Sequence, residues 1–337
     1  MTTRREALLA LPLLCSALHA GAQTSRPSAL RRIAFLYGRT SADTEDVEKT
    51  FLAAMRQLGW VPDKNIAVER AFADGDNTRL ARLAEELIRK RVEVIVALGN
   101  RAPTAVARST RTVPIVFVGL FWPLERGLID SYARPGRNVT GIAGSSGIEA
   151  TTKRLDYLRQ VVPSATHLAW TASPEYFLLE TLSGGEYNLV PVLEAAAKER
   201  GFDSRFHEVR EGQNLDRLFG EIVASSAQAL MSLPMPQSAV TDYAALAIRH
   251  RLPSASFNTG YVEAGCLLGY GTPDSVDQLA ATRAADYVDR ILRGARPNDM
   301  PVYTPDTYEL VINLKTAKAL GVTIPQPLLL RANNVIK

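Results

Sequence analysis

The sequence predicts an α/β fold made of two Rossmann-like, doubly wound lobes joined by a hinge that the chain crosses several times. Three observations support this prediction. Short apolar runs alternate with amphipathic helical stretches along most of the 337 residues. The stretch Val92–Phe121 has the pattern of a compact strand–helix–strand unit. After a complete second lobe the chain still continues through a helix, a proline-rich linker and a strand, which indicates a return between the lobes.

The central unit contains two buried parallel strands. Val92–Leu98 and Ile115–Val118 are rich in valine and isoleucine and hardly alternate with polar residues, as is typical of strands covered on both faces. The helix between them begins after a Gly-Asn turn, and Pro103 suits its first turn, where an N–H has no partner within the helix. The loop 99–101 is therefore predicted at the carboxyl end of a strand and the amino end of a helix, where open α/β sheets bind small ligands.

The other elements of the first lobe follow the same alternation. A helix over Ser41–Leu58 has one apolar face and is stopped by Gly59. Asp76 or Asn77 caps the next helix, which carries a leucine stripe. Further strands are expected at 33–37, 66–72 and 139–143, with a short helix over 125–132.

The second lobe repeats this architecture without visible sequence repetition. Its helices are expected at 149–161, 187–200, 215–223 and 240–250, and its strands at 166–170, 204–209, 229–233, 254–257 and 266–270.

The last part of the chain indicates where the lobes are joined. A long helix over Asp274–Arg293 has an apolar face that includes Leu279, and a proline-rich linker follows at 297–305. A strand over 308–312 then leads into a helix that Asn313 caps and Gly321 ends. These elements predict a first lobe of residues 31–144 and 271–301, and a second lobe of residues 145–270 and 302–337.

The first 22 residues are predicted to be a signal peptide. Arg4-Arg5 precede the apolar run Ala7–Ala17, and Ala20-Gly21-Ala22 matches a cleavage site, so the mature chain is expected to begin near Gln23 in the periplasm. The apolar run is too short to span a bilayer. Export by the general secretory route is expected, and the paired arginines leave the twin-arginine route open.

Composition narrows the function classes. The net charge of +4 is small, and lysines and arginines are dispersed without interleaved aromatic residues, which argues against nucleic-acid binding. Cys266 is the one cysteine left after signal removal, so no internal disulfide is expected. The histidines are scattered without metal-ligand spacing. We expect a monomer with no cofactor and no metal.

Four segments in order carry a family resemblance: RVEVIVA at 91–97, VPIVFV at 113–118, RPGRNVTG at 134–141 and, most specifically, YELVINLKTAKALG at 308–321. The chain from about Arg32 to Lys337 resembles periplasmic substrate-binding proteins of ABC transporters, in the subgroup related to tryptophan- and tyrosine-binding components. The resemblance implies a type I periplasmic binding fold, a ligand in the cleft between the lobes, and delivery to an ABC permease in the inner membrane.

The sequence departs from that family at the fourth strand. Such proteins often carry Gly-Asp-Pro there, and the aspartate can meet a ligand amino group, whereas this chain has Gly119-Leu120-Phe121-Trp122-Pro123. Nothing obvious in the first lobe then balances a ligand ammonium. An aromatic or otherwise apolar carboxylate is therefore expected to bind in preference to the matching amino acid.

Candidate ligand-binding residues lie in the loops that follow predicted strands. Arginines there can donate to a carboxylate, aromatic rings can form an apolar wall, and serines before a helix can hold an oxyanion. A role as helix cap, surface charge or core plug stays open for each of them. The candidates are Tyr37, Arg39, Thr40, Asn100, Arg101, Phe121, Trp122, Ser145, Ser146, Tyr176, Met235, Asn258 and Tyr261.

The leading interpretation is the solute-binding component of an importer for a small aromatic or carboxylated organic solute. An enzyme on a doubly wound fold is the first alternative, but the sequence contains no G-x-S-x-G, phosphate-loop or G-x-G-x-x-G motif. A ligand-sensing module that docks on a membrane receptor is the second alternative, and the sequence does not separate it from the first interpretation.

Overall fold

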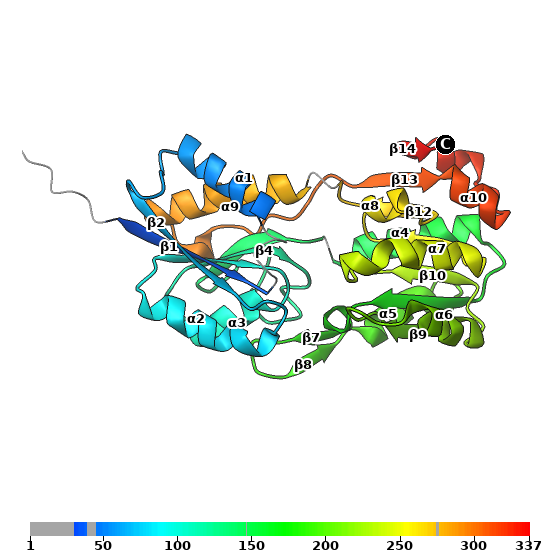
Figure 1. Ribbon diagram of the computed structural model, residues 1–337, viewed down its shortest axis with the longest axis horizontal. Coiled ribbons are helices and arrows are strands. Elements are labelled where there is room, and N and C mark those ends of the chain that lie inside the picture. The colour runs from blue at the N-terminus through cyan, green and yellow to red at the C-terminus, as the bar shows by residue number, and fades with distance from the viewer. Residues whose placement is uncertain (1–29, 39–44, 146, 274–275) are drawn as a thin grey trace, which may run out of the picture.

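The protein consists of two α/β lobes placed end to end along its longest axis (Figure 1). The computed structural model describes residues 30–38, 45–145, 147–273 and 276–337. The predicted signal peptide and its cleavage site lie outside these residues. Within the described ranges, no helix combines the length and apolar character needed to cross a membrane.

Among the described residues, the first lobe holds a five-stranded parallel sheet in the order β2-β1-β3-β4-β5. Both faces of this sheet are covered, so side chains of opposite faces enter different cores. In β1 the alternate residues Ile33 and Phe35 pack against α1 and α9, whereas Ala34 and Leu36 pack against α2 and α3. The elements are β1 (Arg31–Tyr37), α1 (Glu45–Gln57), β2 (Ile66–Phe72), α2 (Leu80–Arg89), β3 (Val94–Leu98), α3 (Ala102–Ser109), β4 (Ile115–Leu120), β5 (Val139–Ala143) and α9 (Val276–Leu292).

The second lobe contains, in the part of the chain described, a seven-stranded sheet in the order β14-β13-β12-β11-β10-β6-β9. β13 runs antiparallel to β12, and the other neighbours are parallel. The strands are β6 (His167–Ala172), β9 (Asp203–Glu208), β10 (Ala229–Ser232), β11 (Ser254–Ser256), β12 (Leu268–Gly271), β13 (Glu309–Asn313) and β14 (Asn334–Ile336). The helices are α4 (Ile148–Val161), α5 (Val190–Lys198), α6 (Leu215–Ala224), α7 (Val240–Arg249), α8 (Gly260–Glu263), α10 (Leu314–Leu320) and α11 (Gln326–Leu329).

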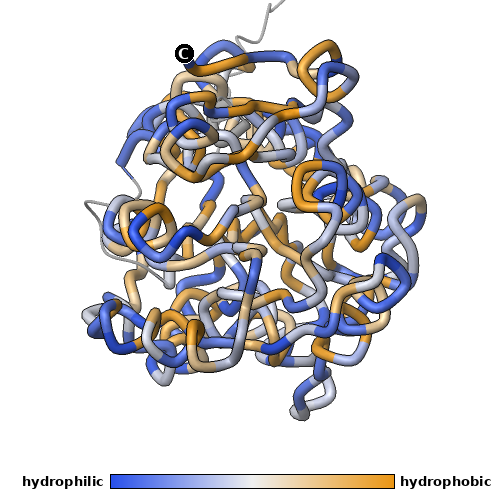
Figure 2. Tube along the Cα trace, turned by 90° about the vertical axis from the view of Figure 1, so that its right-hand side faces the viewer, coloured by the Kyte–Doolittle hydropathy of each residue, from blue (hydrophilic) through white to orange (hydrophobic). Residues whose placement is uncertain are grey.

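The helices that cover the sheets are amphipathic. In Figure 2, which looks along the long axis, hydrophobic and hydrophilic stretches alternate along the helical coils. On one face of the second sheet, α4 and α5 contribute Leu155, Leu158 and Leu193 to a core that also contains Trp170. On the other face, α6 and α7 pack around Phe219 and further apolar side chains. Each lobe therefore has a core on both sides of its sheet.

The chain passes between the lobes after β5, after β12 and before β13, as the two-lobed fold class predicts. Tyr303 still pairs with the first sheet, because its N–H donates to the Gly141 carbonyl oxygen and its carbonyl accepts from the Ala143 N–H. The last crossing therefore begins after Tyr303, two residues later than the predicted boundary at 301/302.

A two-stranded hairpin, β7 (Leu178–Glu180) and β8 (Glu186–Asn188), extends from the second lobe towards the first, below α3 in Figure 1. Leu182 at its turn packs against the first-lobe core that lies beneath α2 and α3. The Leu182 N–H donates to the Arg126 carbonyl oxygen at 2.8 Å, and Arg108 forms an ion pair with Glu180. The hairpin thus holds one lobe against the other.

Most predicted elements are present, and three predictions need correction. Residues 125–132 form turns, because Gly127 adopts a left-handed conformation with φ of 66°. The predicted helix 187–200 begins only at Val190, after strand β8. Leu279 is 40% exposed and does not face the core. The short elements β7, β8, α8, α11 and β14 were not predicted.

Candidate functional site

The candidate site lies where the loops at the carboxyl ends of parallel strands from both sheets meet. The first lobe contributes the loops after β3, β4 and β5, and the second lobe contributes those after β6, β10 and β11. Open α/β sheets bind ligands at this edge, because the strands end there and helix N-termini point towards it.

Aromatic rings from both lobes make contact at this edge. The ring of Phe121, just after β4, lies edge-on to Tyr176 of the second lobe, with centroids 5.3 Å apart. Phe121 also meets Phe257, which follows β11, at 6.4 Å, and Phe257 meets Tyr261 of α8 at 5.0 Å. We call Tyr176, Phe121, Phe257 and Tyr261 the aromatic row. Such rings form the walls of small-molecule sites and prefer edge-to-face contacts of this kind.

Polar groups of the first lobe lie next to the row. Asn100 is buried, and its Oδ1 accepts the Phe121 N–H at 3.0 Å, which fixes the backbone that carries the ring. Arg101 follows at the N-cap of α3, and its Nε is buried without a hydrogen-bond partner among the described residues. The Thr104 Oγ1, one turn into α3, is likewise buried and without a partner in the described part of the chain. An anionic ligand group can satisfy such donors.

Two buried arginines donate hydrogen bonds to the backbone that carries two of these rings. The Arg126 Nε donates to the Phe121 carbonyl oxygen at 2.9 Å, and the Arg154 Nη2 donates to that of Phe257 at 3.4 Å. Arg126 also donates to the Glu175 and Glu180 carbonyl oxygens of the second lobe. Burial lowers the pKa of both guanidinium groups to about 10. Sequence reasoning missed both residues, since a buried arginine in a loop or helix carries no pattern that separates it from a surface one.

A half-buried carboxylate, that of Glu125, lies directly before Arg126 in the chain. The Glu125 Oε2 is inaccessible and has no hydrogen-bond partner among the residues described. Burial raises the pKa of Tyr132 to about 12, and the negative charges of Glu125 and Glu149 add to this rise. Glu125 was not a sequence candidate, and it follows the Gly119–Pro123 segment in which the expected aspartate is missing.

The predicted residues divide into three groups. Asn100, Arg101, Phe121, Tyr176 and Tyr261 come together as described, whereas Arg39, Thr40 and Ser146 lie outside the described residues. The third group is held by local structure. In the first lobe, the Tyr37 hydroxyl donates to Glu48 Oε2 at 2.9 Å, and the Ser145 Oγ accepts the Gly147 N–H. In the second lobe, the Asn258 Oδ1 accepts the Tyr261 N–H and the Met235 N–H donates to the Tyr261 hydroxyl, while Trp122 is buried in the core of that lobe.

Tyr37 illustrates a core environment in detail. Its ring stacks on Phe72 with centroids 4.8 Å apart. Burial, followed by the charge of Glu48, raises the pKa of its hydroxyl well above the ordinary value.

Phe257 is the opposite case, because it joins the aromatic row but was not a candidate. Its position as the last residue of the predicted strand 254–257 was the available signal. Among the described residues, no group of three or more metal-ligating side chains occurs.

Comparison with known proteins places this geometry in a family. Residues 42–336 match the model of the ABC transporter substrate binding protein family. The chain belongs to this family. It is therefore a substrate-binding protein and not an enzyme, and proteins of this kind bind small solutes and work with ABC permeases.

Individual relatives of this substrate-binding protein agree with the assignment. It is 23% identical over 282 residues to a tyrosine-binding protein of Clostridioides difficile, a match that covers 82% of this chain and 76% of the relative. A conserved domain protein of Vibrio cholerae has a TM-score of 0.75 at 22% identity, with 90% of this chain and 99% of that chain covered. A Streptococcus pneumonia ABC domain in complex with L-Trp has a TM-score of 0.75 at 20% identity, with coverage of 91% and 100%. These likenesses extend along both lobes.

Proposed function

We propose that this protein is the solute-binding component of an ABC importer and captures a small aromatic or carboxylated organic solute between its lobes. The observation that carries the proposal is the aromatic row, in which Phe121 of the first lobe contacts Tyr176 and Phe257 of the second. Next to it lies the Arg101 Nε, which has no hydrogen-bond partner among the described residues. The family match supports the transport role. The names of the relatives, which refer to tyrosine and L-Trp, support a ligand with an aromatic ring.

We propose that the ligand residues surround this row. Phe121 and Tyr176 form the wall, and Arg101 and Asn100, at the start of α3, face the anionic group. Arg39, Thr40, Ser145 and Ser146 are proposed as further ligand residues of the first lobe. Tyr37, Trp122, Met235, Asn258 and Tyr261 are proposed to support the site, because each is buried or held in local hydrogen bonds.

The proposed ligand class is an aromatic carboxylate without an α-amino group. Arg101 and Arg126 lie close enough for their charges to interact, and the hydrogen bonds of Arg126 end on carbonyl groups. The cluster therefore favours an anion. A ligand ammonium buried there without a carboxylate costs several kcal/mol in effective terms, enough to decide between the two ligands.

Calorimetric titration with 3-phenylpropionate and with L-phenylalanine tests this preference. We expect the plain carboxylate to bind more tightly, and Arg101→Gln to weaken it by about tenfold or more, since a hydrogen bond to a charged group contributes roughly 1.5–3 kcal/mol. Arg296→Gln, an exposed change in the segment after α9 and outside the candidate site, serves as the control. Tighter binding of the amino acid would refute the preference, and loss of that binding in Glu125→Gln would identify Glu125 as the ammonium partner.

We further propose that residues 1–22 are removed on export and that the mature protein works as a periplasmic monomer that closes on its solute. N-terminal sequencing of periplasmic material is expected to begin near Gln23. Small-angle scattering is expected to show a smaller radius of gyration when a verified solute is added at saturation. An intact Met1 would contradict removal of residues 1–22, and an unchanged radius of gyration would contradict closure on the solute.

A further inference from the structure

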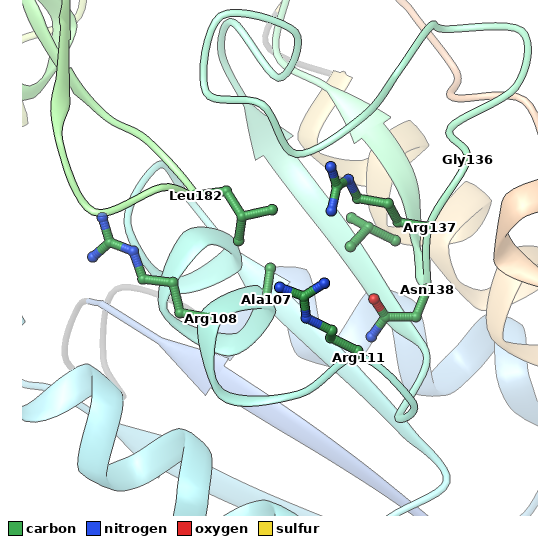
Figure 3. Close-up of a pocket in the computed structure, with 8 residues that line it drawn as sticks. Ala107, Arg108, Arg111, Gly136, Arg137, Asn138 and Leu182 are labelled. Atoms are coloured by element: carbon green, nitrogen blue, oxygen red, sulfur yellow. The ribbon is translucent and has the colours of Figure 1, made fainter.

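A cavity of about 330 Å³ lies between the hairpin β7–β8 and the first lobe (Figure 3). Its walls come from the end of α3, the loop that leads into β5, and Leu182 at the turn of the hairpin. Three arginines line it: Arg108, Arg111 and Arg137. No carboxylate is among the lining residues in the described part of the chain.

The cavity is separate from the candidate solute site. The solute site uses the first residues of α3 and the carboxyl ends of the strands, whereas the cavity uses the last residues of α3 and the beginning of β5. The eight residues of α3 span about 12 Å, and the five residues of β5 about 16 Å. An occupant of the cavity therefore does not touch the aromatic row.

The positive charge around the cavity is only partly balanced. Arg108 forms an ion pair with Glu180, and the Arg137 Nε lies 3.9 Å from Asp130 Oδ1, beyond hydrogen-bond distance. Arg111 has no ion pair or hydrogen bond among the described residues. In Figure 3 the side chains of Arg111 and Arg137 extend into the space next to Leu182, whereas Arg108 extends away towards the hairpin.

The backbone around these arginines is held in place. The Asn138 Nδ2 donates to the Val113 carbonyl oxygen at 2.7 Å and to that of Thr110 at 3.4 Å. These bonds tie the loop that carries Arg137 to the segment that carries Arg111. Two planar, permanently charged guanidinium groups are thus positioned at one cavity, an arrangement suited to bidentate contacts with oxyanions.

We propose that this cavity is a second ligand site, which binds a multiply charged oxyanion such as phosphate or a polycarboxylate and favours close apposition of the lobes. Leu182 belongs to the second-lobe hairpin and closes the cavity, so the complete site exists only while the hairpin lies on the first lobe. Binding that requires this arrangement stabilises it. By linkage, the anion raises solute affinity by the same factor as the solute raises anion affinity.

The first test measures anion binding without any solute. The full exported protein is titrated calorimetrically with inorganic phosphate and with citrate, with ionic strength kept constant by sodium chloride. Saturable binding of at least one anion is expected, and the tighter one identifies the chemical class. The double variant Arg111→Ala/Arg137→Ala is expected to bind at least 30-fold more weakly.

The matched control is Arg134→Ala/Arg296→Ala, which removes two exposed arginines that do not line the cavity and changes the net charge equally. It is expected to keep the affinity of the unmodified protein. Equal loss in both double variants, or no binding of either anion, would overturn the proposal, because general charge attraction would then explain any effect.

The second test addresses the coupling to the lobes. The Leu182 amide donates across the lobe boundary to the Arg126 carbonyl oxygen, so its hydrogen exchange reports on hairpin opening. Phosphate or citrate, whichever binds, is expected to slow this exchange in the unmodified protein and to have no effect in Arg111→Ala/Arg137→Ala. Unchanged or faster exchange at saturation would overturn the coupling. Neither test depends on the identity of the solute, so failure here is distinguishable from failure of the proposed function.

Discussion

Replacing Arg126 by methionine removes the side chain that bonds to both lobes at once. Arg126 is fully buried and donates to the Phe121 carbonyl oxygen at 2.9 Å within its own loop. It also donates to the carbonyl oxygens of Glu180 at 3.2 Å and Glu175 at 3.3 Å, both in the second lobe. Methionine keeps an unbranched stem of similar length but has no N–H, so all three carbonyl groups lose this donor.

Two opposing contributions set how much free energy the contact between the lobes loses in Arg126→Met. A buried carbonyl left without a donor costs about 1–3 kcal/mol, which gives roughly 5 kcal/mol for three of them. Burial lowers the pKa of Arg126 from 12.5 to about 10, and removing a charge that is disfavoured to this extent recovers roughly 3 kcal/mol. The expected net loss of stabilising free energy is about 2 kcal/mol, the difference between these two contributions. The guanidinium remains protonated below pH 9, so this loss does not vary with pH around neutrality.

Hydrogen exchange of the hairpin amides in residues 178–188 measures the effect. A loss of about 2 kcal/mol, if it falls on hairpin docking, accelerates exchange roughly 30-fold. Arg154→Met is the matched control, because Arg154 is equally buried but bonds to Tyr270 and Phe257 within the second lobe. Unchanged hairpin exchange in Arg126→Met, or equal acceleration in Arg154→Met, would refute the assignment of Arg126 to the lobe contact.

Three further substitutions or treatments have defined outcomes. Trp122→Ala is expected to lower the free energy of unfolding in urea by about 3–5 kcal/mol, because the ring is 7% exposed and packs in the second-lobe core. A loss of solute affinity without this destabilisation would show instead that the ring lines the solute site. Cys266 is expected to resist iodoacetamide at pH 8 until urea unfolds the protein, since burial raises the pKa of its thiol to about 12; rapid native-state alkylation would contradict this. Gly141→Ala is expected to give little folded protein in expression and circular dichroism tests, because a Cβ there would lie 2.2 Å from the Phe117 carbonyl oxygen at a φ of +150°; a fully stable variant would show that the strand can shift.

The sequence predicted the regular part of the fold because burial imposes simple patterns there. Continuous Val/Ile runs identified β3 and β4, and the capping residue Asn313 and the stop at Gly321 located α10. At Asn313 the prediction extends to the hydrogen bond itself, since its side chain accepts the Thr316 N–H. The two-lobed fold class is confirmed by the two sheets and by the solved relatives.

The hairpin β7–β8 was missed because its strands are three residues long and half exposed, too short for a period of two to be visible. The Gly184-Gly185 pair in its turn was the available signal, and the helix predicted from 187 concealed it. The candidate site was predicted to the extent that residues after strand ends gather there. Arg126 could not be recognised, because its role depends on long-range hydrogen bonds to the other lobe. Phe257 was overlooked although it ends a predicted strand.

The segment from Phe121 to Arg126 explains how one loop can relate the solute site to the lobe contact. The ring of Phe121 belongs to the aromatic row, Trp122 packs in the second-lobe core, and Arg126 donates to Glu180 of the hairpin. Trp122 adopts a φ of 59°, a conformation that costs a bulky residue about 1–3 kcal/mol. Burial of the indole offsets this cost only while the second lobe is in place. A ligand that moves Phe121 therefore acts on the same six residues that hold the lobes together, so solute binding and lobe closure are expected to change jointly in variants of this loop.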